Sequence, residues 1–293
     1  MTFIAVLKIV APVFLSIGVG YIFARYKKIS LEPLVEILLY ITIPCLVIHS
    51  LSENKVSTDD LVLISIAAVL VIAGSGLLSF IYLKLTGNWN TKGFYLTTMF
   101  MNSGNIPFPL ALLAFGSEGL TKALIYYMAI SILFYSVGLY IAIGKNGAKE
   151  IFKFPLIYSA IIGYWISLSG VEVPEVMGTT LKLLGDATIP LMLLSLGYQL
   201  HSSKISHLQQ SIASSLIRIA GGFLLGIIAS WLLGAEGVTR AIIILSSSMP
   251  AAVINFVISY KYGFDKEFVA STVALSTLIN IITTPLILAW LIS

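Results

Sequence analysis

Residues 102–109 read Asn-Ser-Gly-Asn-Ile-Pro-Phe-Pro, a run rich in polar residues and proline, in the middle of an apolar stretch from about 93 to 114. A second such run, Ser-Ser-Ser-Met-Pro at 246–250 followed by Asn255, stands in the middle of the stretch 239–260. A proline inside a helix lacks the N–H group and leaves the carbonyl four residues earlier without its helical partner. The sequence therefore predicts two helices that are broken at their centres.

The composition of the whole chain is that of an integral membrane protein. Of its 293 residues, 58% are hydrophobic and 10% are charged, and the mean hydropathy is +1.00, well above what a soluble domain shows. Long apolar runs without alternation exclude an outer-membrane barrel. We predict an all-α polytopic protein with ten transmembrane helices, at approximately 3–24, 31–51, 60–84, 93–114, 121–143, 154–170, 175–200, 211–233, 239–260 and 267–292.

The positive charges predict how these helices are oriented. The chain has 17 Lys and Arg against 13 Asp and Glu, and most of the basic residues fall in the odd-numbered loops: Arg25, Lys27, Lys28, Lys84, Lys92, Lys145, Lys149, Lys153, Lys204, Lys261 and Lys266. The positive-inside rule then places those loops in the cytoplasm and both termini outside the cell membrane. It explains the basic excess without a nucleic-acid partner. Arg218, near the cytoplasmic end of the eighth span, is expected to extend to the interface.

The chain also repeats itself. Three pairs of matching positions follow one another at offsets of 143, 146 and 147 residues: P-x3-S-x3-G-Y at 12–21 and 155–164, Thr-Ile-Pro at 42–44 and 188–190, and Gly116 and Gly263 at the ends of the fourth and ninth spans. Each half holds five spans, so the second half enters the membrane in the opposite orientation. We predict two inverted five-helix repeats, 1–145 and 154–293, joined by a cytoplasmic linker at 146–153. Inverted repeats are a recurrent architecture of secondary transporters.

The two predicted breaks form the strongest hypothesis for a binding site. Unpaired backbone at the middle of a membrane is costly unless protein, water or ligand pairs it, and half-helix N-termini carry a partial positive charge that suits an organic anion. Proline kinks satisfied by Ser and Thr hydroxyls are the alternative. The predicted substrate-binding residues are Asn102, Ser103, Gly104, Asn105, Ser248 and Asn255, the helix breaks lie at Pro107, Pro109 and Pro250, and backbone donors are expected around Leu110 and Ala111 and around Ala251 and Ala252.

Several short motifs resemble the auxin efflux carrier family. They are Asn102, Pro109 and Gly116 at intervals of seven residues, Met249-Pro250 with Tyr262-Gly263 at the end of the ninth span, Ile41-Thr42-Ile43-Pro44-Cys45-Leu46, and Ala187-Thr188-Ile189-Pro190-Leu191 with Gly197. The resemblance covers the whole chain, without the large cytoplasmic loop of the long plant members. Asn255 stands where plant relatives tend to carry a second proline, which is a departure from the family pattern.

The resemblance implies a ten-helix, bile acid/sodium symporter-like fold. In that fold helices 1, 2, 6 and 7 form a scaffold and helices 3–5 and 8–10 form a moving transport domain, with the broken helices 4 and 9 crossing at their centres. It also implies an elevator-type alternating-access mechanism and homodimers that form through the scaffold. These are expectations for the structure and for experiment.

Ionisable residues within spans indicate how transport is driven. The chain has no Walker A motif, so we expect neither ATP use nor a cofactor. The coupling candidates are Asp186, about halfway along the seventh span, and Glu36, near the start of the second. Lys182, one helical turn before Asp186, could instead simply neutralise it. A proton is preferred to sodium as the coupling ion, because sodium-coupled relatives of the implied fold place an acidic residue at the ninth-span break and 246–255 holds none. A neutral sodium site made of freed carbonyls and Ser hydroxyls is the alternative.

Other function classes share some of these features. An enzyme is disfavoured because no metalloprotease motif and no paired intramembrane carboxylates occur, and Asp59 and Asp60 are interpreted as capping charges at a helix start. A channel or a ligand-sensing membrane receptor can use similar broken helices and remains the alternative. The sequence therefore predicts a secondary transporter of small organic anions, either auxin-like carboxylates or dicarboxylates, with no metal site.

Overall fold

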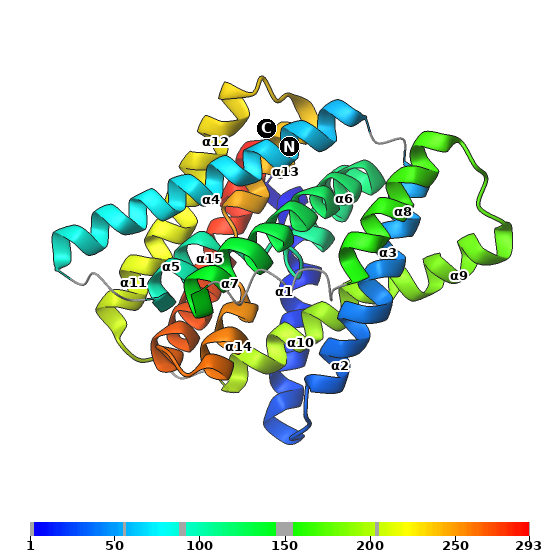
Figure 1. Cartoon of the computed structure of the whole chain (residues 1–293). Helices are drawn as coiled ribbons and strands as arrows, with labels where there is room; N and C mark the ends of the chain where they lie inside the picture. The colour runs from blue at the N-terminus through cyan, green and yellow to red at the C-terminus, as the bar shows by residue number, and fades with distance from the viewer. Residues whose placement is uncertain (1–2, 55–56, 88–91, 145–154, 203–204, 293) are drawn as a thin grey trace.

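A computed structural model describes residues 3–54, 57–87, 92–144, 155–202 and 205–292. Within these ranges the chain is helical and contains no strand (Figure 1). The first half comprises α1 (Phe3–Tyr26), α2 (Glu32–Ile37), the π-helical segment η1 (Leu38–Thr42), α3 (Ile43–Glu53), α4 (Thr58–Thr86), α5 (Lys92–Met99), α6 (Pro107–Leu133), η2 (Phe134–Gly138) and α7 (Leu139–Ile143). The second half comprises α8 (Pro155–Ser169), α9 (Glu175–Asp186), α10 (Thr188–Ser202), α11 (Leu208–Leu216), η5 (Ile217–Gly221), α12 (Gly222–Leu232), α13 (Gly237–Ser247), α14 (Val253–Tyr262) and α15 (Lys266–Ile292).

Seven helical segments of the described chain are long and apolar enough to cross a membrane: Ile4–Tyr26, Glu32–Glu53, Thr58–Thr86, Pro107–Ile143, Glu175–His201, Leu208–Leu232 and Lys266–Ile292. The predicted fourth and ninth spans are not continuous helices, because each is divided by its break. The predicted sixth span is the shorter helix α8, which stops before Gly170 with its positive φ of 66°. The ten-helix inverted repeat therefore stays a prediction, and the linker 146–153 lies outside the described residues.

The fourth and fifth predicted spans are joined differently from expectation. A loop was expected between about 115 and 120, but α6 continues across these positions and only Gly116 departs from helical geometry, with φ 69° and ψ −160°. Glycine reaches this conformation without the strain that a Cβ would cause. One residue therefore redirects the helix where a connecting loop was predicted.

The start of α4 shows how local sequence sets a helix end. The Ser57 hydroxyl accepts a hydrogen bond from the backbone N–H of Asp60 at 3.0 Å, and Asp59 and Asp60 lie in the first turn. Acidic groups are favourable there because the N-terminus of a helix carries partial positive charge. At the other end Gly87, with φ 74°, caps the helix. The capping interpretation of this acidic pair is confirmed.

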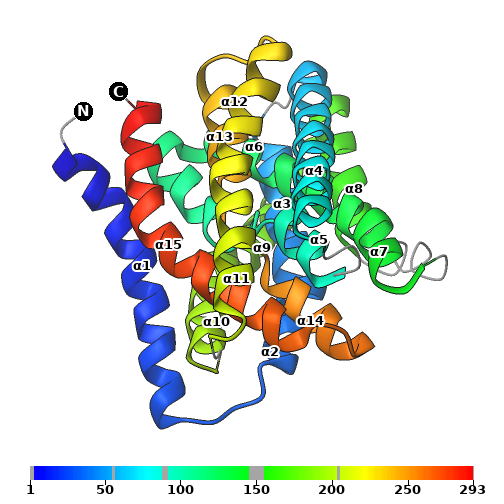
Figure 2. The ribbon, with the colours of Figure 1, turned by 90° about the vertical axis from the view of Figure 1, so that its left-hand side faces the viewer.

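Two packing groups surround the centre of the molecule. In one, α1 packs along α10, and α3 packs against α8 and α9; a Cβ added to Gly20 would lie 2.2 Å from the Leu194 carbonyl oxygen, so the helices meet backbone to backbone. In the other, α4, α6, α12 and α13 pack together, and α11 packs against α15. Figure 2 shows α15 beside α1, where the two groups also meet.

Candidate functional site

The two broken segments contact each other through their backbones at the centre of the molecule. The N–H of Asn102 donates to the Pro250 carbonyl at 2.7 Å, and the N–H of Ala252 donates to the Phe100 carbonyl at 3.0 Å. These bonds form an isolated antiparallel bridge between the breaks. The Asn255 side-chain amide also donates to the Phe100 carbonyl, at 3.0 Å. Backbone groups that the breaks expose are thus paired across the crossing.

Only one of the two polar atoms of the Asn102 side chain has a hydrogen-bond partner among the described residues. Its Oδ1 accepts a hydrogen bond from the Asn105 N–H at 3.1 Å. Its Nδ2 is buried and has no partner among the described residues. Asn105 in turn donates its side-chain amide to the Met192 carbonyl on α10 at 3.4 Å. A buried amide without a partner costs free energy, so a ligand acceptor at this point would be favourable.

A cavity of about 170 Å³ lies beside the crossing. Its walls come from α2 and η1, from both breaks, from α6 and η2, from α10, and from the start of α14. The polar residues on these walls are Asn102, Ser103, Asn105, Tyr127, Ser131, Tyr135, Ser195 and Gln199, and no charged residue of the described chain lines the cavity. Gly104 also lines it, and a Cβ there would lie 2.8 Å from the Met192 Cε.

The N-terminus of α6 offers fewer backbone donors than predicted. Pro107 and Pro109 have no N–H group, and the N–H of Phe108 already donates to the Gly104 carbonyl at 3.1 Å. The expected donor at Leu110 is bonded to the Ile106 carbonyl at 3.4 Å. The prediction of a free donor at Leu110 is therefore wrong, because two prolines within one turn remove N–H groups and helix bonding engages the rest.

The free donors of the second break lie one step further along the chain than predicted. The N–H of Ala251 donates to the Ser276 hydroxyl at 3.1 Å, and that of Ala252 is used in the crossing, so neither is available to a ligand. The next N–H groups, on Val253 and Ile254, are the first of α14 and have no partner within that helix. Both residues line the cavity. The donors predicted at 251–252 are thus replaced by those at 253–254.

Two of the predicted substrate-binding residues are buried at the crossing and do not reach the cavity. Ser248 and Asn255 are fully buried and do not line the cavity. The Ser248 hydroxyl donates to the Leu245 carbonyl at 2.7 Å, and the Oδ1 of Asn255 has no partner among the described residues. The present contacts of both side chains support the crossing, and their assignment to substrate stays a prediction.

The coupling candidates occupy different surroundings. The Asp186 carboxylate is 60% exposed at the end of α9, where it pairs with the Lys182 ammonium at 2.6 Å, away from the cavity wall. Glu36 lines a second cavity of about 520 Å³ together with Glu32. This cavity shares wall residues with the central one, among them Val35 and Val257. Of the two candidates, Glu36 is therefore the one that lines a cavity adjoining the central cavity.

Arg218 was expected to extend to the interface, and this is wrong. It lies on η5 and is fully buried. Its guanidinium donates to the carbonyls of Thr98 and Met99 and to the Ser247 carbonyl, the Met99 bond measuring 3.0 Å and the Ser247 bond 2.6 Å. Position alone could not reveal this, because the carbonyls come from helices far away in sequence. The adjacent Gly221-Gly222 pair was the available signal of close packing.

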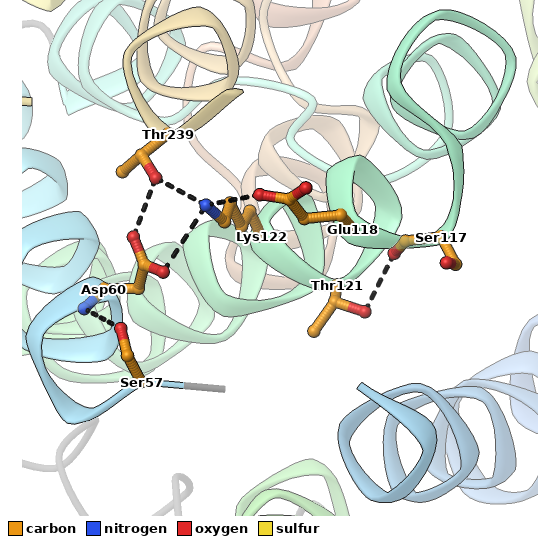
Figure 3. A network of polar contacts seen from close by, with 7 residues as sticks. All are labelled: Ser57, Asp60, Ser117, Glu118, Thr121, Lys122 and Thr239. Carbon is orange, nitrogen blue, oxygen red and sulfur yellow. Dashed lines mark hydrogen bonds and ion pairs between the residues drawn. The ribbon is translucent and has the colours of Figure 1, made fainter. Parts of the chain in front are cut away.

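A separate polar network joins three helices, near the starts of α4 and α13 (Figure 3). The Lys122 ammonium lies 3.4 Å from an Asp60 carboxylate oxygen and 2.8 Å from a Glu118 carboxylate oxygen. It also donates to the Thr239 hydroxyl at 2.7 Å, and that hydroxyl donates to Asp60 at 2.7 Å. The network connects α4, α6 and α13, and none of these residues lines the central cavity.

Comparison with known proteins shows which protein family the sequence matches. A family model described as "Membrane transport protein" matches residues 140–288, just over half of the chain. An uncharacterized transporter of Methanothermobacter thermautotrophicus is 27% identical over 298 residues, which cover 98% of each protein. An uncharacterized transporter of Methanocaldococcus jannaschii is 25% identical over 292 residues, which cover 94% of this chain and 95% of that protein.

Proposed function

The chain belongs to the membrane transport protein family, and from this premise we propose that it is a secondary transporter of small organic anions. The proposed architecture is the ten-helix inverted repeat, with α5 and the first part of α6 as the fourth helix and α13 and α14 as the ninth. The proposed substrate site is the cavity at their crossing. Asn102, Ser103, Gly104 and Asn105 provide one wall of it.

The observation that carries the proposal is the set of unpaired donors at this cavity. No backbone hydrogen bond outside the helix ladders engages the N–H groups of Val253 and Ile254 at the start of α14, and the buried Nδ2 of Asn102 has no partner among the described residues. The N-terminus of a helix also carries about half a positive elementary charge. A carboxylate would satisfy these donors and complement this charge, whereas a cation would meet the wrong sign.

The size and polarity of the cavity narrow the substrate class. A volume of about 170 Å³ is below the roughly 300–1,000 Å³ of sites for drug-sized ligands, which favours a small solute. Phe100, Phe134 and Tyr127 contribute aromatic wall. The second charge of a dicarboxylate would be desolvated there without a cationic partner. We therefore favour a monocarboxylate with an apolar body, with dicarboxylates as the competing class.

The arrangement of the two cavities supports an elevator-type mechanism. The central cavity lies between α2 and α10 on one side and the crossing on the other. The second cavity extends from it toward Ile29 and Leu31, at the connection between α1 and α2. With this connection in the cytoplasm, the structure corresponds to an inward-facing state. The α1, α3, α8, α9 and α10 group then acts as scaffold and dimer surface, and the crossing moves past it.

Proton coupling is proposed through Glu36, which lines the second cavity, between the α1–α2 connection and the wall residues shared with the central cavity. A carboxylate in this position can exchange protons with the cytoplasm and approach the substrate site. Asp186 stays the second coupling candidate, although its pairing with Lys182 offers a purely structural role.

Uptake into proteoliposomes tests the proposal. A panel of mono-, di- and aromatic carboxylates is offered with a pH gradient, a sodium gradient or neither. We expect the pH gradient to drive accumulation of a small monocarboxylate, and we expect Asn102→Ala to lose this accumulation. Gln209→Ala, which replaces an exposed polar residue, is the control and should retain it. Concentrative uptake would exclude a channel. Saturable binding without flux would contradict transport and favour a ligand-sensing receptor.

A further inference from the structure

The crossing leaves three helix-end carbonyls without their usual partners. In a continuous helix the Thr98 carbonyl would accept from the N–H of Asn102, and the Met99 carbonyl from that of Ser103. Instead, the Asn102 N–H donates to Pro250 and the Ser103 N–H donates to the Met101 carbonyl. The breaks thus leave the carbonyls of Thr98 and Met99, the last of α5, inside the protein without their helical N–H partners.

The same diversion occurs at the end of α13. The Ser247 carbonyl would accept from the N–H of Ala251 in a continuous helix, but that N–H donates to the Ser276 hydroxyl at 3.1 Å. Buried carbonyls without partners are costly. At this point the last carbonyls of two half-helices converge, and each C-terminus carries about half a negative elementary charge.

One guanidinium satisfies all three carbonyls. Nη1 of Arg218 donates to Thr98 and to Met99, and Nη2 donates to Ser247. Nη1 also lies 3.4 Å from the Ser75 hydroxyl oxygen. No carboxylate of the described chain forms an ion pair with it. The single positive charge of Arg218 is therefore balanced by two helix ends, whose partial charges together amount to about one negative charge.

The neighbouring sequence makes room for this arrangement. A Cβ added to Gly222 would lie 2.1 Å from the Ser247 carbonyl oxygen and 2.2 Å from Nη2 of Arg218. A side chain at 222 would thus displace the guanidinium from its acceptor. Ser75 precedes Arg218 by 143 residues, which is one of the three offsets of the proposed repeat. The two halves therefore direct a hydroxyl and a cation, respectively, at the same point.

We propose that Arg218 is a tethered cation that occupies the place of a coupling metal cation. Half-helix C-terminal carbonyls and hydroxyls are the oxygen ligands that transporters with broken helices offer to sodium. Here the guanidinium takes these ligands permanently. The assignment rests on the proposed transport function and deepens it, because it makes transport independent of sodium.

The first test needs only the purified wild-type protein. Its thermal unfolding midpoint is measured in sodium, in lithium and in N-methyl-D-glucamine at equal ionic strength. A cation that binds only the folded state raises the Tm increasingly as its concentration exceeds its Kd, so we expect the same Tm in all three salts. A rise in sodium or lithium would overturn the proposal. No substrate is involved, so failure of the carboxylate uptake assay leaves this result independent.

The second test removes the guanidinium. Arg218→Ala should lower the Tm on the order of 10 °C, because converging carbonyls lose their only charged partner. Millimolar guanidinium chloride should restore part of this loss in the variant and have no such effect on the wild type. Arg240→Ala, at an exposed arginine of α13, is the matched control and should show neither effect. A Tm equal to that control, or no rescue by guanidinium, would contradict the proposal.

Milder variants keep the test decisive if Arg218→Ala does not yield folded protein. Arg218→Lys retains the charge but loses the planar fork, so its Tm should fall by less. Gly222→Ala should lower the Tm, because its Cβ would clash with both the Ser247 carbonyl oxygen and Nη2 of Arg218, whereas Gly178→Ala, where a Cβ meets nothing within 4 Å, should not. Wild-type stability in both Arg218→Lys and Gly222→Ala would show that the guanidinium is dispensable.

Discussion

The backbone N–H of Asn102 donates to the carbonyl of Pro250 at 2.7 Å, across the point where the two broken segments meet. This bond joins two positions 148 residues apart in the sequence. It holds the Asn102 backbone at the cavity wall, where the side-chain Oδ1 accepts from the Asn105 N–H and Nδ2 has no partner among the described residues. The backbone of Asn102 therefore holds the crossing, while its side-chain Nδ2 is the atom available to a ligand.

Asn102→Ala should therefore weaken substrate binding more than it weakens the fold. The variant keeps the backbone bond to Pro250 and loses one donor to the ligand, so we expect binding to fall about tenfold or more, from roughly 1–3 kcal/mol. Asn102→Asp should weaken it further by placing a negative charge beside the anion. Equilibrium binding on the purified variants measures both, and unchanged affinity in both would exclude Asn102 from the site.

Asn255→Ala should weaken the fold more than it weakens substrate binding. Asn255 is fully buried, does not line the cavity and donates to the Phe100 carbonyl at 3.0 Å. Its loss removes a bond of the crossing, and we expect about 1–3 kcal/mol of destabilisation, seen as a lower Tm. Residual affinity in the surviving folded fraction should exceed that of Asn102→Ala. A normal Tm with lost binding would instead place Asn255 among the ligands.

The close contact of α1 with α10 predicts a pair of contrasting glycine variants. A Cβ at Gly20 would lie 2.2 Å from the Leu194 carbonyl oxygen, whereas a Cβ at Gly18 would meet nothing within 4 Å. Gly20→Ala should therefore destabilise the protein by about 1–3 kcal/mol through overpacking. Gly18→Ala, on the same helix, should be neutral or slightly stabilising. Thermal unfolding of the two variants compares them directly, and equal midpoints would contradict the packing of these helices.

The network around Lys122 predicts a difference between a partly buried and an exposed ion pair. The Lys122 side chain is 14% exposed and contacts Asp60, Glu118 and Thr239, so Lys122→Met should cost about 1–2 kcal/mol. Lys266, whose side chain is 52% exposed beside Glu267, is the control. Lys266→Met should change stability little. If both variants have the same Tm, the network does not hold α4, α6 and α13 together.

The breaks were predictable because their signals are local. Clusters of polar residues beside proline in an apolar stretch, as at 102–109 and 246–250, coincide with the two breaks, whereas the isolated Pro12 and Pro285 lie inside the continuous helices α1 and α15. Which donors stay free depends on partners elsewhere, such as the Ser276 hydroxyl that engages the Ala251 N–H. The burial of Arg218 likewise depends on carbonyls of α5 and α13. Local hydropathy alone therefore predicted an interfacial arginine and misplaced the donors.

Replacing each carboxylate by its amide should distinguish the two coupling candidates, Asp186 and Glu36. The Asp186 and Lys182 side chains are 60% and 58% exposed, and exposed pairs contribute about 1 kcal/mol or less, so Asp186→Asn should leave stability and pH-driven uptake nearly unchanged. Glu36 lines the second cavity, which reaches the α1–α2 connection and shares wall residues with the central cavity. Glu36→Gln removes its titration and should abolish the response of uptake to the pH gradient while downhill flux persists. Uptake by both variants is measured with and without a pH gradient. Loss of pH-driven uptake in Asp186→Asn alone would reverse the assignment and identify α9 as the proton-carrying helix.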